Sequence, residues 1–356
     1  MRWTAEEESI LINNLGELSY TEIAELIERK YNERLPGFPT VRTIAAIRKK
    51  VSRDQLLNIQ NNPYTKAWEN IVAIAEEYRS KSAHLDMGLN TSKERKILSF
   101  SDLHIPFFLW EEMKLALNTH SDANVVVLNG DILDAYIFST FSKSKRIAAL
   151  KEYISAFDLV KILSENFESV VIVSGNHDYR TSRAVQNTNL DKEATQILRP
   201  DLLARIANGE ELNEFAELIE KHSFSNVFYD KHEPWYTRVG KTIFCHPSGF
   251  GSAYPGATVV KLLDHFTNRM SDVDFDSIVV GHTHKVYKGV VAGKLLIEQG
   301  AMAHSLPYQF KPDLRFKNAM NGYAVVYQDS NGNTNFNDST SVYLGSHLPK
   351  KKKVLI

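Results

Sequence analysis

Short apolar runs recur along the chain from about residue 96 onward. They lie at residues 97–100, 125–128, 170–173, 242–244, 278–280, 295–297 and 323–327. Rich in β-branched residues, they predict buried strands, and the helical spacing between them predicts helices near 110–120, 145–166 and 257–270. Strands buried on both faces and separated by helices are typical of an α/β sheet. We therefore predict an α/β domain over residues 94–340, with residues 180–235 forming a helical, polar insertion over one end of the sheet.

The first 56 residues have a different pattern. Apolar residues at helical spacing predict one helix near residues 10–18 and a second near 23–27, which Ser19 or Thr21 can cap. A third short helix is expected over residues 40–53. We expect residues 1–56 to form a small three-helix domain, residues 57–93 a helical linker, and residues 341–356 a basic tail.

Composition narrows the class of protein. The 356 residues are 43 % hydrophobic and 24 % charged, which is ordinary for a soluble globular protein of about two domains. No apolar run approaches the roughly 18 residues of a membrane span, and residues 1–7 lack the apolar region of a signal peptide. The single cysteine, Cys245, excludes a disulfide framework. We therefore expect no membrane contact and a cytoplasmic location, in the host cytoplasm if a phage encodes the chain.

The candidate chemistry lies where the predicted strands end. Polar segments follow five apolar runs, at residues 101–104, 129–131, 174–178, 245–247 and 281–284. Ligand sites of open α/β sheets lie outside the carboxyl ends of the strands, so these segments should converge. Their carboxylates, imidazoles and amide oxygen suit Mn²⁺, Fe²⁺ or Zn²⁺. Seven such groups exceed the needs of one ion and suit two ions about 3.5–4 Å apart, a pair that can generate hydroxide near neutral pH.

In this order, the motifs Asp-x-His, Gly-Asp, Gly-Asn-His-Asp, His and Gly-His-x-His resemble those of the calcineurin-like metallophosphoesterase superfamily. The resemblance covers roughly residues 95–330. It implies a four-layer α/β/β/α sandwich of the α/β class behind the small N-terminal domain. It also implies seven ligands for two divalent metal ions: Asp102, His104 and His284 on the first, Asp131 as the bridge, and Asn176, His246 and His282 on the second. Manganese is the favoured metal, with iron or zinc left open.

The same resemblance assigns the catalytic pair. His177 would contact the phosphate and protonate the leaving oxygen, and Asp178 would orient His177 through its ring N–H. Asp134 has two open readings: it hydrogen-bonds a ligand, or it caps a following turn.

Two departures from the protein phosphatases indicate the branch. Those enzymes carry Arg-Gly after the second Asp of Gly-Asp-x-x-Asp, where this chain has Ala135 and Tyr136 after Asp134. They also carry Arg-Gly-Asn-His-Glu, where this chain has residues 174–178. Both differences favour the nuclease and phosphodiesterase branches over protein phosphatases.

The N-terminal unit resembles Myb/SANT-like or homeodomain-like helix-turn-helix modules. Its charge is segregated, with eight Glu over residues 6–33 and a basic third helix. Five side chains of that helix could contact DNA: Arg42, Arg48, Lys49, Lys50 and Arg53. The alternative is a packing or dimerisation domain, which would make the protein a homo-oligomer. Four arginines of the insertion could line a phosphate-rich channel or simply cover helix surfaces: Arg180, Arg183, Arg199 and Arg205.

Together these patterns predict a metal-dependent phosphoesterase. The favoured function is a nuclease tethered to its DNA substrate by the N-terminal module. A first alternative is a phosphomonoesterase or cyclic-nucleotide phosphodiesterase acting on a small molecule, with the N-terminal module binding a partner. A second is a DNA-binding regulator with a degenerate enzyme domain.

Overall fold

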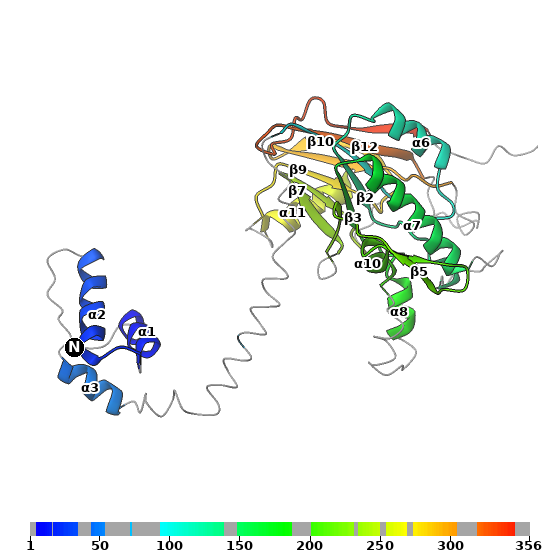
Figure 1. Cartoon of the computed structure of the whole chain (residues 1–356). Coiled ribbons are helices and arrows are strands. Elements are labelled where there is room, and N and C mark those ends of the chain that lie inside the picture. The colour runs from blue at the N-terminus through cyan, green and yellow to red at the C-terminus, as the bar shows by residue number, and fades with distance from the viewer. Residues whose placement is uncertain are drawn as a thin grey trace, which may run out of the picture. The chain divides into compact units, whose positions relative to one another are not determined.

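The structure, a computed structural model, forms two compact units, Met1–Lys81 and Ser82–Ile356 (Figure 1). It describes residues 5–15, 17–34, 44–53, 72, 93–138, 148–186, 201–230, 234–249, 254–268, 273–304 and 319–345. Most of the predicted linker over 57–93 and residues 346–356 of the predicted tail lie outside these ranges. Residues 341–345, which we expected to begin the tail, instead form part of a strand of the second unit. Among the helices within them, none is long and apolar enough to cross a membrane.

The first unit contains the three predicted helices, α1 (Ala5–Asn14), α2 (Tyr20–Arg34) and α3 (Ile44–Arg53). Ser19 caps α2 as expected, because its Oγ accepts the backbone N–H of Glu22 while the Glu22 carboxylate accepts the backbone N–H of Ser19 at 2.8 Å. The helices pack around a small apolar core: Leu11, Leu15, Ile23, Ile27, Ile47 and Val51. This core explains the helical spacing of apolar residues in the sequence.

The second unit is built on two sheets. The larger has the order β13-β12-β1-β2-β3-β6, with β1 (Arg95–Phe100), β2 (Val125–Asn129), β3 (Ser169–Val173), β6 (Val227–Tyr229), β12 (Asn321–Gln328) and β13 (Thr340–Gly345). The smaller has the order β10-β11-β9-β8-β7, with β7 (Tyr236–Val239), β8 (Thr242–Cys245), β9 (Ser277–Val280), β10 (Val286–Val291) and β11 (Lys294–Gln299). All seven predicted strands are present, but they are divided between two sheets.

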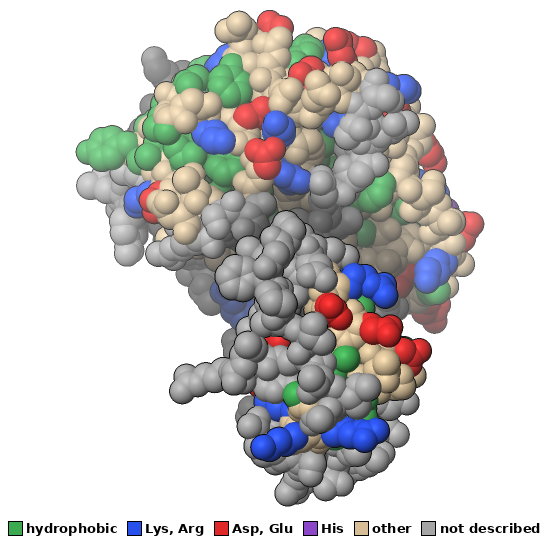
Figure 2. Space-filling view, turned by 90° about the vertical axis from the view of Figure 1, so that its left-hand side faces the viewer, with side chains coloured by type: hydrophobic (Ala, Val, Ile, Leu, Met, Phe, Trp, Pro, Cys, Tyr) green, Lys and Arg blue, Asp and Glu red, His purple; other side chains and the backbone are tan. Residues whose placement is uncertain are grey.

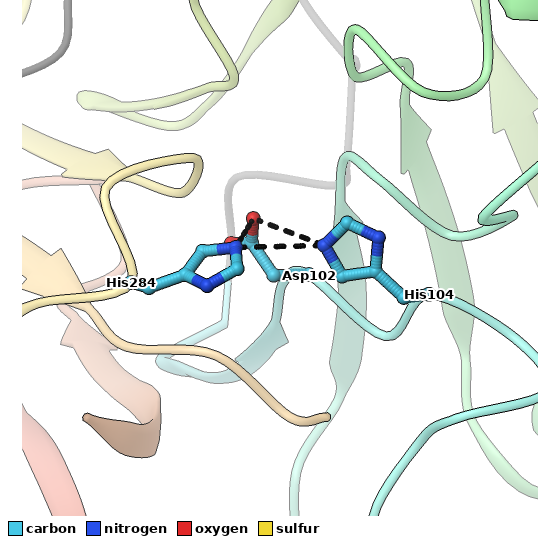
Figure 3. Close-up of side chains that lie close together, drawn as sticks. All are labelled: Asp102, His104 and His284. Carbon is cyan, nitrogen blue, oxygen red and sulfur yellow. Dashed lines mark hydrogen bonds and ion pairs between the residues drawn. The ribbon is translucent and has the colours of Figure 1, made fainter. Parts of the chain in front are cut away.

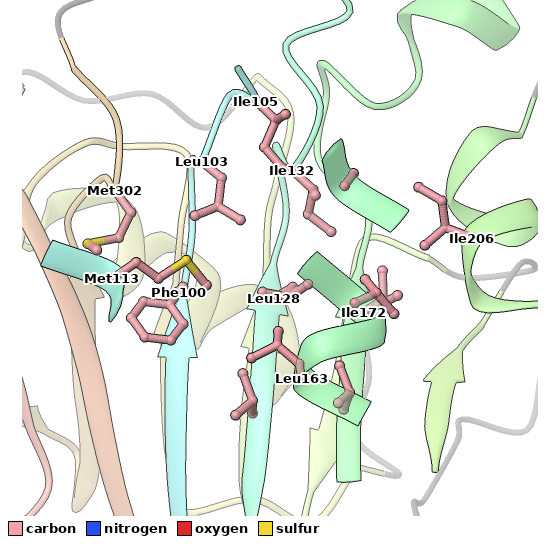
Figure 4. Close-up of a cluster of buried hydrophobic side chains, with 14 of the residues drawn as sticks. Phe100, Leu103, Ile105, Met113, Leu128, Ile132, Leu163, Ile172, Ile206 and Met302 are labelled. Atoms are coloured by element: carbon pink, nitrogen blue, oxygen red, sulfur yellow. The ribbon is translucent and has the colours of Figure 1, made fainter. Parts of the chain in front are cut away.

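Strand β2 shows why both faces of the larger sheet are apolar. Val126 and Leu128 join the core under helices α6 (Trp110–Thr119) and α7 (Ala149–Asn166), part of which is drawn in Figure 4. Val125 and Val127 point the other way and pack between the two sheets. Successive side chains of a strand point to opposite faces, so one strand contributes to both cores.

A third core lies on the outer face of the smaller sheet. Helix α11 (Ala257–Asn268) packs Val259, Leu262 and Phe266 against Ile243 of β8 and Ile278 of β9. The three cores therefore separate four layers, in the order α/β/β/α, as the family resemblance implied (Figure 1). Burial of each large apolar side chain contributes about 1.5–3 kcal/mol, which stabilises the layers that carry the site.

Residues 180–235 differ from the helical insertion that we expected. Their described part contains helices α8 (Arg180–Gln186) and α10 (Leu202–Ala207), but also the hairpin β4 (Glu210–Leu212) and β5 (Leu218–Lys221). The segment also supplies β6, which pairs with β3 at the edge of the larger sheet. These strands are three or four residues long, too short for an alternating pattern to be visible in the sequence.

Candidate metal centre

The loops at the carboxyl ends of strands from both sheets meet at one site. The larger sheet supplies Asp102 after β1, Asp131 after β2 and residues 176–178 after β3. The smaller sheet supplies His246 after β8 and residues 282–284 after β9. The site therefore lies at the seam between the two sheets, and the chain must form both of them to build it.

The first cluster consists of Asp102, His104 and His284 (Figure 3). Nε2 of His284 lies 2.9 Å from Oδ1 of Asp102, and Nε2 of His104 lies 3.9 Å from the same oxygen. The two Nε2 atoms are 3.4 Å apart. A carboxylate oxygen and two imidazole nitrogens that converge in this way could hold a divalent metal ion.

The second cluster consists of Asp131, His246 and His282. Nε2 of His246 lies 3.3 Å from Oδ2 of Asp131. The same oxygen lies 3.8 Å from Nε2 of His104, which belongs to the first cluster. Asp131 is thus located between the clusters, where a bridging carboxylate would have to be.

Buried atoms without hydrogen bonds indicate that these residues fit metal ions. Within the described structure, Oδ1 of Asn176 is buried and makes no hydrogen bond, and the buried Oδ1 of Asp102 and Nε2 of His246 have ion-pair contacts inside the site but no regular hydrogen bond. An unsatisfied buried polar atom costs about 1–3 kcal/mol, and a bound cation would remove that cost. The other ring nitrogen of His246, Nδ1, lies 2.9 Å from the backbone oxygen of Asn129, which orients Nε2 toward the site.

The backbone at the site is unusual. Five of the expected ligands have left-handed φ angles: Asp102 (55°), His104 (46°), Asp131 (51°), His282 (70°) and His284 (51°). This conformation is uncommon for residues other than glycine and costs about 1–3 kcal/mol each, so the surrounding structure must hold it. Hydrogen bonds between the first two loops do so, from the N–H of Asp102 to the oxygen of Gly130 at 3.0 Å and from that of His104 to the oxygen of Asp131 at 2.9 Å.

Gly130 allows these loops to approach each other. Its φ is +83°, and a Cβ atom built there would lie 2.2 Å from Cγ of His246. No other residue type fits this position without moving the His246 ring.

The charges of the site are strongly coupled. Burial alone would raise the pKa of Asp102, but His284 and His246 outweigh it and hold the pKa below its ordinary value. Burial likewise opposes the lowered pKa of Asp131, which His246 and His177 stabilise as the anion. Burial lowers the pKa of His246, but the negative charge of Asp131 outweighs burial and raises this pKa to about 10. Binding a cation at His246 would therefore release a proton.

The expected role of Asp178 is wrong. Its carboxylate does not contact the ring of His177; it accepts the backbone N–H of Gly175 at 2.7 Å and that of Leu133 at 2.8 Å. The side chain bonds backbone donors of its own loop and of the loop after β2, which need a partner. Burial, and then the charge of Asp131, raise the pKa of Asp178 to about 7.

Asp134 makes the contact that we had expected of Asp178. Its Oδ1 lies 3.0 Å from Nδ1 of His177 and 3.1 Å from Nδ1 of His104. Of the two open readings for Asp134, the structure supports the hydrogen bond to a ligand. One carboxylate oxygen thus orients both the expected catalytic histidine and an expected metal ligand.

Sequence reasoning missed Glu152. It lies on α7, is 1 % exposed, and accepts the backbone N–H groups of Ala135 at 2.6 Å and Tyr136 at 3.0 Å. It therefore holds the loop that carries Asp134. The signal was present in the sequence, because Glu152 falls within the apolar stripe of α7 at helical spacing, where a charged residue needs a reason.

The five expected DNA contacts have different environments. Arg48 and Lys49 are exposed on α3, on the small unit whose exposed basic side chains are visible in Figure 2. Lys50 differs from the expectation, because it is 8 % exposed and forms an ion pair with Glu8. We therefore remove Lys50 from the expected DNA-binding surface. Arg42 and the side chain of Arg53 lie outside the described part of the chain.

The fold and the clusters of His and Asp at the site agree with a comparison of families. A sequence model of the calcineurin-like phosphoesterase family matches residues 95–286, more than half of the chain. The chain therefore belongs to the calcineurin-like phosphoesterase family. It is accordingly a phosphoester hydrolase by family, and members of this family typically depend on two metal ions.

Comparison with solved structures gives only distant similarity. Solved structures similar to the chain include vacuolar protein sorting 29 from Cryptosporidium parvum, with 20 % identity, a TM-score of 0.33, and 71 % of this chain and 99 % of that chain covered. An archaeal phosphodiesterase has 13 % identity, a TM-score of 0.33, and coverage of 70 % and 99 %. These TM-scores are low, so the assignment rests on the family match. No curated protein matches the chain.

Proposed function

We propose that this protein is a two-metal phosphodiesterase that cleaves DNA. The observation that carries the proposal is the position of Asp131, whose Oδ2 lies 3.3 Å from His246 of one cluster and 3.8 Å from His104 of the other. A shared carboxylate between two sets of nitrogen ligands suits a pair of divalent ions. We propose Mn²⁺ as the preferred metal, since Asp, His and Asn ligands accept it together with iron and zinc.

Each residue of the site has a distinct role in this proposal. Asp102, His104 and His284 hold one ion, and Asn176, His246 and His282 hold the other, with Asp131 shared. When bound, the ions supply positive charge that polarises the phosphoryl group and activates water near neutral pH. His177 faces the reacting phosphate and, once its Nε2 has taken up a proton from solvent, donates that proton to the leaving oxygen. Asp134 orients His177 through Nδ1, which leaves Nε2 on the side of the site, 3.9 Å from Oδ2 of Asp131.

The choice of DNA as substrate and partner rests on the N-terminal unit. Arg48 and Lys49 lie side by side in the sequence of α3, both are exposed, and neighbouring basic side chains on a helix can contact phosphates. A tether of this kind would raise the local concentration of a long substrate at the catalytic unit without new contacts in the site.

An assay on several substrates tests this proposal. The full chain with Mn²⁺ should cleave linear, circular or single-stranded DNA and bis(para-nitrophenyl) phosphate faster than para-nitrophenyl phosphate. Deletion of residues 1–56 should reduce cleavage of long DNA and leave the small diester unaffected. Preference for the monoester, with no effect of the deletion, would instead identify a small-molecule phosphatase. No hydrolysis, or hydrolysis that survives Asp131→Asn, would contradict the two-metal function.

A further inference from the structure

Arg180 has an unusual position for an arginine. It is the first residue of α8, and its Nη2 lies 2.8 Å from Nε2 of His177. Its Nη1 donates to the backbone oxygen of Asp134 at 2.9 Å. The side chain is only 14 % exposed. A guanidinium is thus held against the expected catalytic histidine, on a helix outside the two metal clusters.

The other arginines of the same segment have different surroundings. Nε of Arg205 pairs with Glu210 at 3.0 Å, and its guanidinium lies 5.6 Å from the ring centre of Tyr153. Arg183 is exposed on the surface of α8. Arg199 lies outside the described residues. Of the three described arginines, Arg180 is therefore the one that reaches the site.

The hydrogen bond from Arg180 occupies Nε2 of His177, the ring nitrogen that would act on the substrate. Nδ1 of this ring faces Asp134, and Nε2 faces Arg180. A guanidinium can only donate hydrogen bonds, so Nε2 accepts one in this arrangement. Nε2 also lies 3.9 Å from Oδ2 of the shared carboxylate of Asp131. A substrate can therefore reach His177 only when Arg180 exchanges this hydrogen bond for another.

A phosphate oxygen is the better partner for Arg180. Arginine binds phosphate through paired, charge-assisted hydrogen bonds, which are about twice as strong as a bond to a neutral acceptor. A phosphate would also place negative charge between the guanidinium and the two cations of the proposed site. We infer that Arg180 binds a non-bridging oxygen of the substrate phosphate and releases His177 as it does so. The inference rests on the proposed function and adds to it a residue that recognises the phosphate.

Binding of inorganic phosphate to the full chain in Mn²⁺ tests this inference. Arg180→Gln should raise the dissociation constant, measured by titration calorimetry, by roughly 10- to 100-fold, since a hydrogen bond to a charged group is lost. Arg180→Lys should raise it at least about threefold, because one ammonium group cannot replace the planar fork. Arg183→Gln, the matched control on the same helix, should stay within about twofold. The metal content of every variant should equal that of the wild type.

Three other results would overturn the inference. If both Arg180 variants bind phosphate like the wild type while hydrolysis of bis(para-nitrophenyl) phosphate falls, Arg180 only supports the loop of Asp134. If Arg183→Gln weakens phosphate binding equally, general charge accounts for the effect. Should Arg180→Gln fail to fold, Arg180→Lys decides alone. A wild type that neither binds phosphate nor cleaves the diester overturns the proposed function and this inference with it, so the two failures are distinguishable.

Discussion

Oδ1 of Asp134 lies 3.0 Å from Nδ1 of His177, and this carboxylate also reaches His104. Burial would raise the pKa of Asp134, but hydrogen bonds from the two histidines outweigh it and keep the carboxylate ionised. An ionised acceptor fixes the proton of each ring on Nδ1 and leaves each Nε2 facing the site. The orientation of both rings thus depends on a residue that we do not expect to touch a metal ion.

Asp134→Asn should therefore lower the turnover number by roughly 10²-fold or more, because a neutral amide accepts the two ring protons more weakly than a carboxylate, and its NH₂ group can donate to a ring nitrogen and favour the wrong tautomer. Steady-state kinetics on bis(para-nitrophenyl) phosphate measure this effect. Asp178→Asn is the matched control, since the partners of Asp178 among the described residues are backbone N–H groups of its own and the neighbouring loop. It should affect stability more than turnover, and equal losses of turnover in both variants would contradict the role of Asp134.

Asp131→Ala should empty at least one of the two proposed metal sites. The reason is that its Oδ2 lies within 4 Å of histidines of both clusters, at 3.3 Å and 3.8 Å. Elemental analysis of the purified protein measures metal per chain. His177→Ala should keep both ions and lose turnover. Full metal content in Asp131→Ala would show that Asp131 is not shared, and metal loss in His177→Ala would show that His177 is a ligand.

The stability of the metal-free protein should depend on Glu152. Burial is the main reason why the pKa of Glu152 rises from 4.5 to about 8. The hydrogen bond from the backbone N–H of Tyr136 lowers this pKa, and the charge of Asp134 raises it further. The folded state therefore holds a proton that the unfolded state releases between these values. This contribution to the free energy of unfolding is complete below pH 4.5 and is lost as the pH rises to about 8, by at most about 1.4 kcal/mol per pH unit.

Urea unfolding at about pH 5, 6.5 and 8 with a chelator present measures this dependence. Glu152→Gln cannot ionise, so the wild type should lose stability relative to the variant as the pH rises. Parallel curves for the two proteins would mean that Glu152 is ionised throughout this range.

Gly130→Ala should be destabilised by more than about 2 kcal/mol. An alanine costs about 1–2 kcal/mol in the left-handed region, and here its Cβ would also displace the His246 ring. Gly293 is a matched control, because its φ is +73° and a Cβ there meets no atom within 4 Å. Chemical unfolding should give Gly293→Ala only the backbone cost. Equal destabilisation of the two variants would show that the His246 ring moves aside freely.

Much of the fold could be predicted because the central strands are continuous apolar runs. Val125 to Leu128 must be buried on both faces, and the sequence shows it directly. The sequence did not show which elements pack against each face of these strands, since a valine packs equally well against a helix or a second sheet. Edge strands such as β10, half exposed with mixed side chains, gave no comparable signal.

The site was predictable in composition but not in hydrogen bonding. Strand-end placement brings Asp102, Asp131 and the four histidines His104, His246, His282 and His284 together, as expected. The carboxylate that contacts His177 could not be assigned from the sequence. Asp178 follows His177 directly along the chain, whereas Asp134 comes next to it only in the fold, where its side chain points at the ring. Glu152 is separated from Asp134 along the chain, and only the packing of α7 brings it to that loop.

The seam between the two sheets has a consequence for how the protein is made. Asp102, Asp131 and His177 are translated well before His246, His282 and His284, which the smaller sheet supplies. Strand β12, the neighbour of β1, comes later still. A nascent chain therefore leaves the ribosome with four of its seven expected metal ligands and an unpaired edge on β1, and the expected site can form only after its second half has been synthesised.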